Sequence, residues 1–210
     1  MEKLTRRPVT TLLLLVNLLV GYYLWSRGVE VSAVSFSYDA VCNSGEAWRV
    51  VTASFSHFDA MHIGFNLMSL YQLGDLEFVY GSAAFLYLNI DLVFITMIIC
   101  LAICSIRMKY FGHVEIQHQQ SIGFSCVLFA WMVAASVRMD QYCPLFFMPS
   151  MCFDTWHLAV PLLSLSLPVN LGPFVLLVVT KLVLPRTSLV GHFSGIVIGF
   201  PLAWNLIDWL

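Results

Sequence analysis

Residues 82–106 read SAAFLYLNIDLVFITMIICLAICSI and contain a single charged side chain, Asp91. A helix rises about 1.5 Å per residue, so an apolar stretch of this length can cross the roughly 30 Å hydrocarbon core of a bilayer. The rest of the chain is similar, because 60% of its 210 residues are hydrophobic, 10% are charged and the mean hydropathy is +0.84. Soluble domains carry about 25% charged residues. The sequence therefore predicts an integral membrane protein in contact with the lipid bilayer.

Five further stretches have the composition of membrane spans, and short polar segments separate them. The fifth is the least regular, because Pro161, Pro168 and Pro173 interrupt it and proline ends or kinks a helix. Trp204 and Trp209 in the last stretch suit the membrane interface. We expect one all-α domain over residues 1–210, a polytopic six-helix bundle with spans at about 10–25, 57–73, 82–106, 121–137, 170–184 and 191–209.

The basic residues predict the orientation. Lys3, Arg6 and Arg7 precede the first span, and the positive-inside rule places them in the cytosol. Six crossings then return the C-terminus to the cytosol. Arg107 and Lys109 fall on the opposite side, but the first helix usually dominates the orientation.

Composition also excludes some partners and cofactors. The net charge is −2 and no run of basic residues is present, so nucleic acid is not an expected partner. The cysteines lack the paired CxxC spacing of a structural zinc site. We therefore expect no metal or cofactor, and we interpret most of the cysteines as buried apolar residues: Cys42, Cys100, Cys104, Cys126, Cys143 and Cys152.

Polar residues inside the predicted spans are candidates for function, because burying them in lipid is costly. His62 and Asn66 are four residues apart, hence on one face of the second span. Ser125 lies near the start of the fourth span and His192 near the start of the sixth. Spans that alternate in direction bring these starts to the same, non-cytosolic side. Taken singly, His62 and Asn66 could form interhelical hydrogen bonds that hold the bundle together, and a lone serine in a membrane helix usually bonds a carbonyl of its own helix.

Together these residues supply the parts of a serine protease. A serine hydroxyl is a poor nucleophile until a base takes its proton, and donors must then stabilise the oxyanion. Ser125 would attack the substrate carbonyl, and His192 would accept its proton and return it to the leaving amine. Asn66, His62 and the Ser125 amide would hold the oxyanion. Gly123 permits a close backbone approach beside the nucleophile.

Two glycines explain how His192 could come near Ser125. Gly195 and Gly199 form a small-xxx-small face on the sixth span, which allows another helix to approach closely. Simple helix packing is the alternative interpretation of this face.

Several sequence blocks occur in a characteristic order. They are Trp48-Arg49, His57 with His62-Ile-Gly-Phe-Asn66, Glu77 with Tyr80-Gly81-Ser82, Gly123-Phe-Ser125 and Gly191-His192-Phe-Ser-Gly195. Together, across most of the chain, they resemble the signature of the rhomboid intramembrane serine proteases. The resemblance implies a six-helix membrane fold, a Ser125–His192 dyad and single-pass transmembrane proteins as substrates.

A longer stretch of sequence points to one subfamily of the rhomboid proteins. Residues 121–130 read SIGFSCVLFA, followed later by Tyr142-Cys-Pro144 and Leu184-Pro185. These features are similar to the eukaryotic rhomboid domain-containing proteins of the endoplasmic reticulum. They imply that the protein lies in that membrane or another endomembrane, with misfolded membrane proteins among its substrates.

The chain departs from the family pattern at three places. Cys126 stands where glycine usually follows the nucleophile, and its side chain could crowd the oxyanion site or the helix contact. Phe129 stands where many relatives have a tyrosine that packs on the catalytic histidine. The segment 141–167 is long for a loop of this fold and is interpreted as an insertion at the membrane interface.

The sequence lacks the motifs of other intramembrane proteases. His113-Val-Glu-Ile-Gln-His118 lacks the HExxH arrangement of zinc proteases. Intramembrane aspartyl proteases need two facing aspartates, and Gln72 stands where the motif of that family has glycine. Internal repeats typical of transporters are missing. The serious alternative is a rhomboid-like protein that binds membrane clients without cutting them. Proteins of that kind typically lack the serine or the histidine, and this chain keeps both Ser125 and His192.

Overall fold

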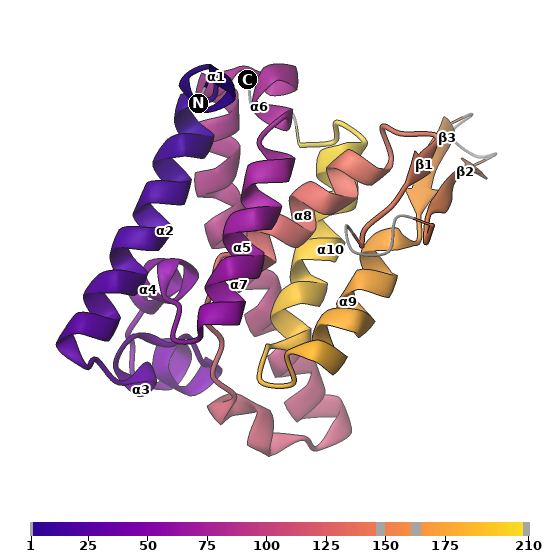
Figure 1. The fold of residues 1–210 in the computed structure, drawn as a ribbon. Coiled ribbons are helices and arrows are strands. Elements are labelled where there is room, and N and C mark those ends of the chain that lie inside the picture. Colours follow the sequence, from indigo (N-terminus) through magenta and orange to yellow (C-terminus); the bar gives the residue numbers. More distant parts are fainter. Residues whose placement is uncertain (1, 146–149, 161–164, 208–210) are drawn as a thin grey trace.

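The computed structural model describes residues 2–145, 150–160 and 165–207. The structure is mostly helical (Figure 1). The end of the sixth predicted span, with Trp209, lies outside the described residues. The helices are α1 (Glu2–Thr5), α2 (Pro8–Arg27), α3 (Val31–Val34), α4 (Arg49–Phe55), α5 (Ala60–Leu73), α6 (Leu76–Tyr80), α7 (Ser82–Phe111), α8 (Ser125–Ser136), α9 (Gly172–Val183) and α10 (Leu189–Ala203), with a π-helical turn η1 (Asp39–Asn43) and a 3₁₀ turn η2 (Val114–His118).

Each of the six predicted span ranges overlaps one of the longer helices, and α2, α7 and α10 extend beyond their ranges. Among the described residues, α2 and α7 are long and apolar enough to cross a bilayer by themselves. Three other apolar helices are shorter, with 12 residues in α8, 12 in α9 and 15 in α10. Six crossings of the membrane therefore stay a prediction.

The direction of the helices alternates. In Figure 1, α2, α7 and α9 run one way through the molecule, whereas α5, α8 and α10 run the other way. The first residues of α5, α8 and α10 consequently point toward the side of the molecule opposite to α1 and α6. This alternation is the property that brings the N-terminal turns of three helices, and their polar side chains, toward one another.

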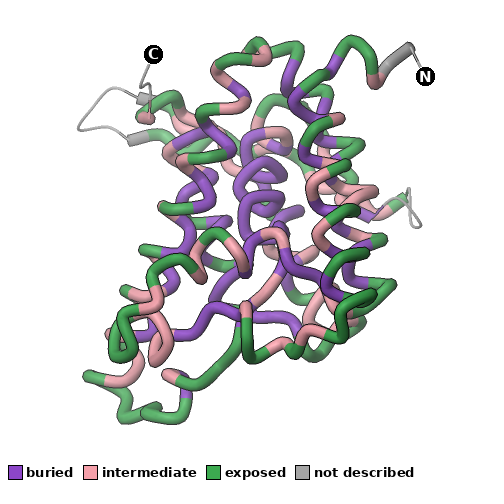
Figure 2. Tube along the Cα trace, turned by 90° about the vertical axis from the view of Figure 1, so that its left-hand side faces the viewer, coloured by how far each residue is buried: buried purple, intermediate pink, exposed green. Residues whose placement is uncertain are grey.

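The helix α8 lies at the centre of the bundle. All of its residues except Ala135 are buried, and Figure 2 shows that the buried residues gather in the interior of the molecule. A helix that is apolar on every side is stable only when other helices surround it. Its closest neighbour is α10, because a Cβ at Gly195 would overlap the Cys126 carbonyl oxygen and one at Gly199 would lie 2.9 Å from the Ala130 oxygen. The predicted close approach along the two glycines is confirmed.

The all-α prediction is wrong for the segment after α8. Three antiparallel strands, β1 (Gln141–Tyr142), β2 (Phe153–Val160) and β3 (Leu165–Asn170), form a small sheet in the order β1-β2-β3. Pro168 in β3 is tolerated because β3 is an edge strand, whose outward side needs no donor. Residues 146–149 and 161–164 of the predicted interfacial insertion lie outside the described residues.

The cysteine prediction is correct in part. Cys100, Cys104 and Cys126 are buried, as expected for apolar residues in a core, and Cys42 is exposed. Cys143 and Cys152 instead form a disulfide, which links the segment after β1 to the start of β2. Their spacing gave no warning, because the antiparallel pairing of β1 with β2 brings the two residues together.

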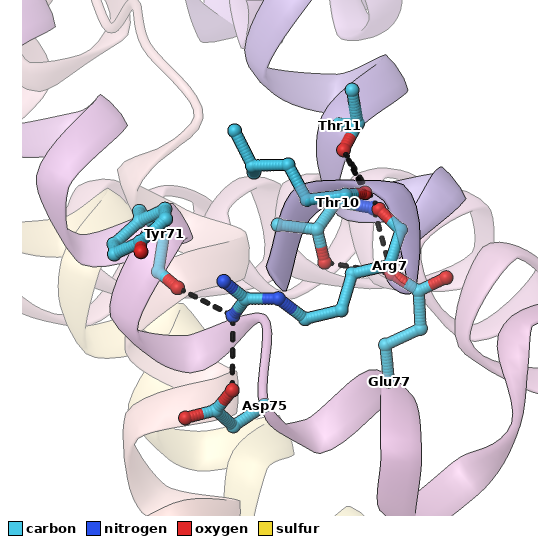
Figure 3. A network of polar contacts seen from close by, with 7 residues as sticks. Arg7, Thr10, Thr11, Tyr71, Asp75 and Glu77 are labelled. Atoms are coloured by element: carbon cyan, nitrogen blue, oxygen red, sulfur yellow. Dashed lines mark hydrogen bonds and ion pairs between the residues drawn. The ribbon is translucent and has the colours of Figure 1, made fainter. Parts of the chain in front are cut away.

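The buried carboxylate of Glu77 joins α6 to the starts of α2 and α7. It accepts hydrogen bonds from the Val9 and Thr10 amides at 3.0 and 2.8 Å, and from the Thr10 and Ser82 hydroxyls at 2.7 Å each. The first amides of a helix have no partner within the helix, so Glu77 caps α2 from a distance. Beside it, the Arg7 guanidinium donates to the Tyr71 carbonyl and to Asp75 (Figure 3).

We expect replacement of Glu77 by alanine to lower the free energy of unfolding by about 3 kcal/mol, because several buried donors lose a charged acceptor. Thermal unfolding in detergent, followed by circular dichroism, measures this loss. Glu115→Ala is the matched control, since Glu115 is exposed on η2. Equal unfolding temperatures for the two variants would contradict the capping role.

Protonation of Glu77 is expected to lower the stability of the fold at acid pH. Burial by itself raises the pKa of Glu77, but the hydrogen bonds from Ser82, Thr10 and Val9 outweigh burial and hold the pKa below its ordinary value. A carboxyl whose pKa is depressed in the folded state stabilises the fold above the unfolded pKa, about 4.3, and loses that contribution as the pH falls through the folded pKa. Stability at neutral pH is therefore unaffected by small pH changes at this group.

Candidate active site

Ser125 and His192 meet where the first turns of α8 and α10 lie side by side. Ser125 is the first residue of α8, and His192 lies in the first turn of α10. The Ser125 Oγ and His192 Nε2 atoms are 2.7 Å apart, which is hydrogen-bonding distance, and both residues are buried. The structure thus brings together two residues that are 67 positions apart in sequence.

Local structure holds the histidine in place. The Ser188 hydroxyl caps α10 by accepting from the Gly191 amide at 3.1 Å. One turn after Ser125, the ring of Phe129 stacks on the His192 imidazole, with centroids 4.6 Å apart and an angle of 23° between the planes. The phenyl ring at this position therefore packs on the histidine as expected, without a hydroxyl group.

His62 and Asn66 lie beside the serine on α5. The Asp59 side chain caps this helix by accepting from the His62 amide at 2.9 Å. The Asn66 Nδ2 atom donates to the His62 carbonyl at 2.9 Å, which leaves its second hydrogen free. Within the described part of the chain, His62 Nε2 and Asn66 Oδ1 are buried and have no hydrogen-bond partner. The two side chains are near the nucleophile, and their role at an oxyanion stays a prediction.

Gly123 lies against the His62 imidazole and leaves no room for a side chain of its own. Its φ of +100° lies in the region that favours glycine, and a Cβ there would lie 2.7 Å from the His62 Cε1 atom. Any larger residue would both strain the backbone and displace the imidazole. The Gly123 amide donates to the Ala53 carbonyl at 2.8 Å, so it is already paired.

His57 is a further residue of the site that chemical reasoning from the sequence passed over. It is fully buried, and its ring meets the His62 ring edge to face at a centroid distance of 5.0 Å. Because His57 precedes α5 rather than lying on it, helical spacing could not place it against His62. Asp59 is the sequence signal that predicts this arrangement. As a helix-capping residue it marks the start of α5, so His57 lies in the segment before the helix and His62 in its first turn.

A cavity of about 530 Å³ opens in front of Ser125 and His192. It extends from these residues between α5, α8 and α9 to Asp75 and Arg138 at the far end of α5 and α8. Its size is that of a binding site rather than a packing defect. Cys126 does not line it; a Cβ at Gly191 would lie 3.0 Å from the Cys126 sulfur, so this side chain faces α10. The helix contact accommodates the thiol, and the cavity is not crowded by it.

Known proteins share this sequence pattern. The family model described as the rhomboid domain matches residues 44–209. The chain is 28% identical over 199 residues to "Rhomboid-like protein 15" of Arabidopsis thaliana, covering 93% of this chain and 44% of that protein. It is 24% identical to "Rhomboid-like protein 14, mitochondrial" of Arabidopsis thaliana, covering 91% of this chain and 54% of the relative.

A human protein is similar as well. "Rhomboid-related protein 4" of Homo sapiens is 28% identical over 160 residues, which cover 75% of this chain and 46% of that protein. The chain thus spans about half the length of the curated relatives it matches.

Proposed function

The chain belongs to the rhomboid family of membrane proteins, and we propose that it is an intramembrane serine protease that cleaves transmembrane segments of other membrane proteins. The observation that carries this proposal is the 2.7 Å contact between Ser125 Oγ and His192 Nε2 at the head of a cavity. A buried serine whose only role is to bond a carbonyl of its own helix does not need an imidazole at hydrogen-bonding distance.

The contact supports a two-step mechanism. His192 Nε2 takes the hydroxyl proton as Ser125 Oγ attacks the scissile carbonyl, which gives a tetrahedral intermediate. The imidazolium then gives this proton to the departing amine, leaving an ester on Ser125. A water molecule, deprotonated by His192, hydrolyses the ester and restores the free serine. Phe129 limits rotation of the imidazole, so Nε2 stays directed at the hydroxyl.

The developing negative charge needs donors. The second hydrogen of Asn66 Nδ2 and the His62 Nε2 atom, when protonated, are the side-chain candidates, and the Ser125 amide is the backbone candidate. His62 Nε2 is buried without a partner among the described residues, and Asn66 Nδ2 has a second hydrogen besides the one it donates to the His62 carbonyl. Donors fixed in this way stabilise the transition state more than donors in water do.

The proposed topology has six spans with both termini in the cytosol and a site that opens toward the non-cytosolic side. A substrate helix must unwind locally there, because its backbone hydrogen bonds otherwise hide the carbonyls from Ser125. We further propose the endoplasmic reticulum or another endomembrane as the location. Colocalisation of the tagged protein with organelle markers tests this, and the name of the mitochondrial relative makes mitochondria the outcome to compare.

Cleavage by purified protein in proteoliposomes tests the proposed function. The substrate is a single-pass protein with helix-weakening residues near one end of its span, and mass spectrometry locates the cut. Specific product from the wild type, absent with Ser125→Ala and present with Ser136→Ala, supports a protease, because Ser136 is a buried serine at the other end of α8. Wild-type protein that binds the substrate and yields no product would favour the non-cleaving alternative.

Substitution of Cys126 by glycine is expected to change cleavage by less than about threefold, since its side chain lies against α10 and not in the cavity. Initial cleavage rates of the two proteins provide the comparison. An inert wild type with an active Cys126→Gly variant would instead mean that the thiol silences the site.

The disulfide offers a test of orientation. In the proposed topology Cys143 and Cys152, which follow α8, lie on the cytosolic side, where disulfides are kept reduced, so the bond between them in the structure should be open in the cell. We expect both thiols to react with a maleimide in freshly isolated membranes without added reductant. A pair that reacts only after reduction would favour the opposite orientation.

A further inference from the structure

The hairpin formed by β2 and β3 has two unlike faces. Neighbouring residues of a strand point to opposite faces, and residues paired across two antiparallel strands share a face. The pairs Trp156–Val169 and Leu158–Leu167 therefore form one face, which we call the apolar face. The pairs that alternate with them form the opposite face, which is more polar: Thr155–Asn170, His157–Pro168 and Ala159–Ser166.

The polar face is attached to the helices at its base. The Thr155 Oγ1 atom lies 3.0 and 2.7 Å from the carbonyl oxygens of Ser136 and Met139, at the end of α8. The buried Asn170 side chain donates to Thr155 Oγ1 at 3.0 Å and accepts from the Gly172 amide, at the start of α9, at 2.8 Å. Because the side chains of a strand alternate, the apolar face is turned away from the end of α8.

The apolar face is open to its surroundings. Trp156 and Leu158 are 66% and 61% exposed. Residues 155–160 and 165–170 contain no Asp, Glu, Lys or Arg. Soluble domains carry about 25% charged residues, and surfaces that bind another protein have a polar rim. The composition of the hairpin is therefore that of a segment in contact with lipid.

The position of the hairpin fits such a contact. In Figure 1 the sheet lies at the level of the N-terminal half of α2 and projects sideways from the bundle, next to α8. The helix α2 is long enough to cross a bilayer, so a segment at this level that projects sideways meets the membrane near one of its surfaces.

We propose that the β2–β3 hairpin is a membrane-binding element, which inserts Trp156 and Leu158 into the boundary between lipid headgroups and acyl chains. The backbone sets the depth. An open sheet edge such as β3 cannot lie in the hydrocarbon, where its unpaired amides and carbonyls find no partner, whereas headgroups and water pair with them at the boundary. Interfacial elements bury their apolar face by about 5–10 Å, and tryptophan is enriched at this depth.

The attachment to α8 gives the hairpin a consequence for the active site. Thr155 holds the hairpin to the end of α8, so the level of the hairpin in its leaflet sets the level of that helix end. At about 1.5 Å per residue, Ser125 then lies roughly 16 Å deeper along the axis of α8. In the proposed topology this leaflet is the cytosolic one.

The test places the fluorescent amino acid dansylalanine on one face at a time in the 210-residue chain, reconstituted in phosphatidylcholine vesicles. Leu158→dansylalanine probes the apolar face, and Ser166→dansylalanine is the matched control on the opposite face. Both positions are exposed, so the probe replaces no buried side chain. Quenching is measured with lipids that carry a spin label near the headgroup end of the acyl chain, and with iodide on both sides of the vesicle.

We expect lipid quenching at position 158 to exceed that at position 166 by about threefold or more, and iodide quenching to show the reverse order, because the two side chains point to opposite sides of the hairpin. Iodide quenching at position 158 as strong as at 166 would overturn the proposal. Protection of position 158 from both quenchers would also overturn it, since a protein surface and not lipid would then cover the face.

A charge on either face gives a second measurement. Trp156→Asp should lower lipid quenching at position 158 to the level at position 166, because a carboxylate resists leaving water. His157→Asp adds the same charge at the next position, on the opposite face, and should leave the quenching unchanged. Equal effects of the two substitutions would contradict insertion of the apolar face.

Discussion

Replacement of His192 by alanine is expected to reduce the cleavage rate by about 10⁴-fold or more, with little change in the amount of folded protein. Without the imidazole, the Ser125 hydroxyl has no base at hydrogen-bonding distance, and the leaving amine has no acid. Loss of the base in a serine hydrolase costs about as much as loss of the whole catalytic unit.

The measurement is the single-turnover cleavage rate in proteoliposomes, compared among His192→Ala, Ser125→Ala and the double variant. Because the two residues act as one unit, we expect the double variant to be no slower than either single one. His118→Ala is the control, because this histidine is exposed on η2 and does not line the cavity. Appreciable cleavage by His192→Ala, or additive losses in the double variant, would show that the dyad is not the catalytic unit.

Replacement of Gly195 by alanine is the second large effect that we expect. A Cβ at this position would overlap the carbonyl oxygen of Cys126 and lie 3.0 Å from the Phe129 Cβ. Both neighbours belong to α8, and a backbone oxygen cannot rotate away as a flexible side chain can. The helices α8 and α10 must therefore separate, which should cost about 3 kcal/mol of unfolding free energy, the upper part of the range for overpacking.

The same separation should move His192 from Ser125, so cleavage should fall further than the loss of folded protein explains. Gly64→Ala is the matched control: Gly64 also lies within a helix, α5, but a Cβ there meets no atom within 4 Å. Alanine at that position should be neutral or slightly stabilising, because it restricts the unfolded chain. Unfolding temperatures and cleavage rates for both variants decide the matter. Similar behaviour of the two would mean that α8 and α10 are not held together by close backbone contact.

The positions of the long helices could be predicted from the local pattern of apolar residues. Each of the six apolar ranges overlaps a helix, since apolar composition and the length of a stretch are properties of neighbouring residues. Boundaries moved where capping decided them: α5 begins at Ala60, after the Asp59 cap, and not at residue 57. The region from 141 to 170 was misjudged because its apolar residues suit strands as well as helices, and a strand makes its hydrogen bonds with another strand and not within its own segment.

By itself, the sequence determined that this is a membrane protein, which residue types could perform acyl transfer, and that glycines on the last helix would allow a close helix contact. These conclusions depend on composition and on spacing within one helix, where the period of the α-helix relates sequence to space. Only the tertiary structure decided that Cys126 faces α10, that Glu77 caps α2, and that Ser69 and Gln72 line the cavity beyond the serine. Such facts depend on which faces of separate helices meet, and packing between residues nearly 70 positions apart fixes them, not any local pattern.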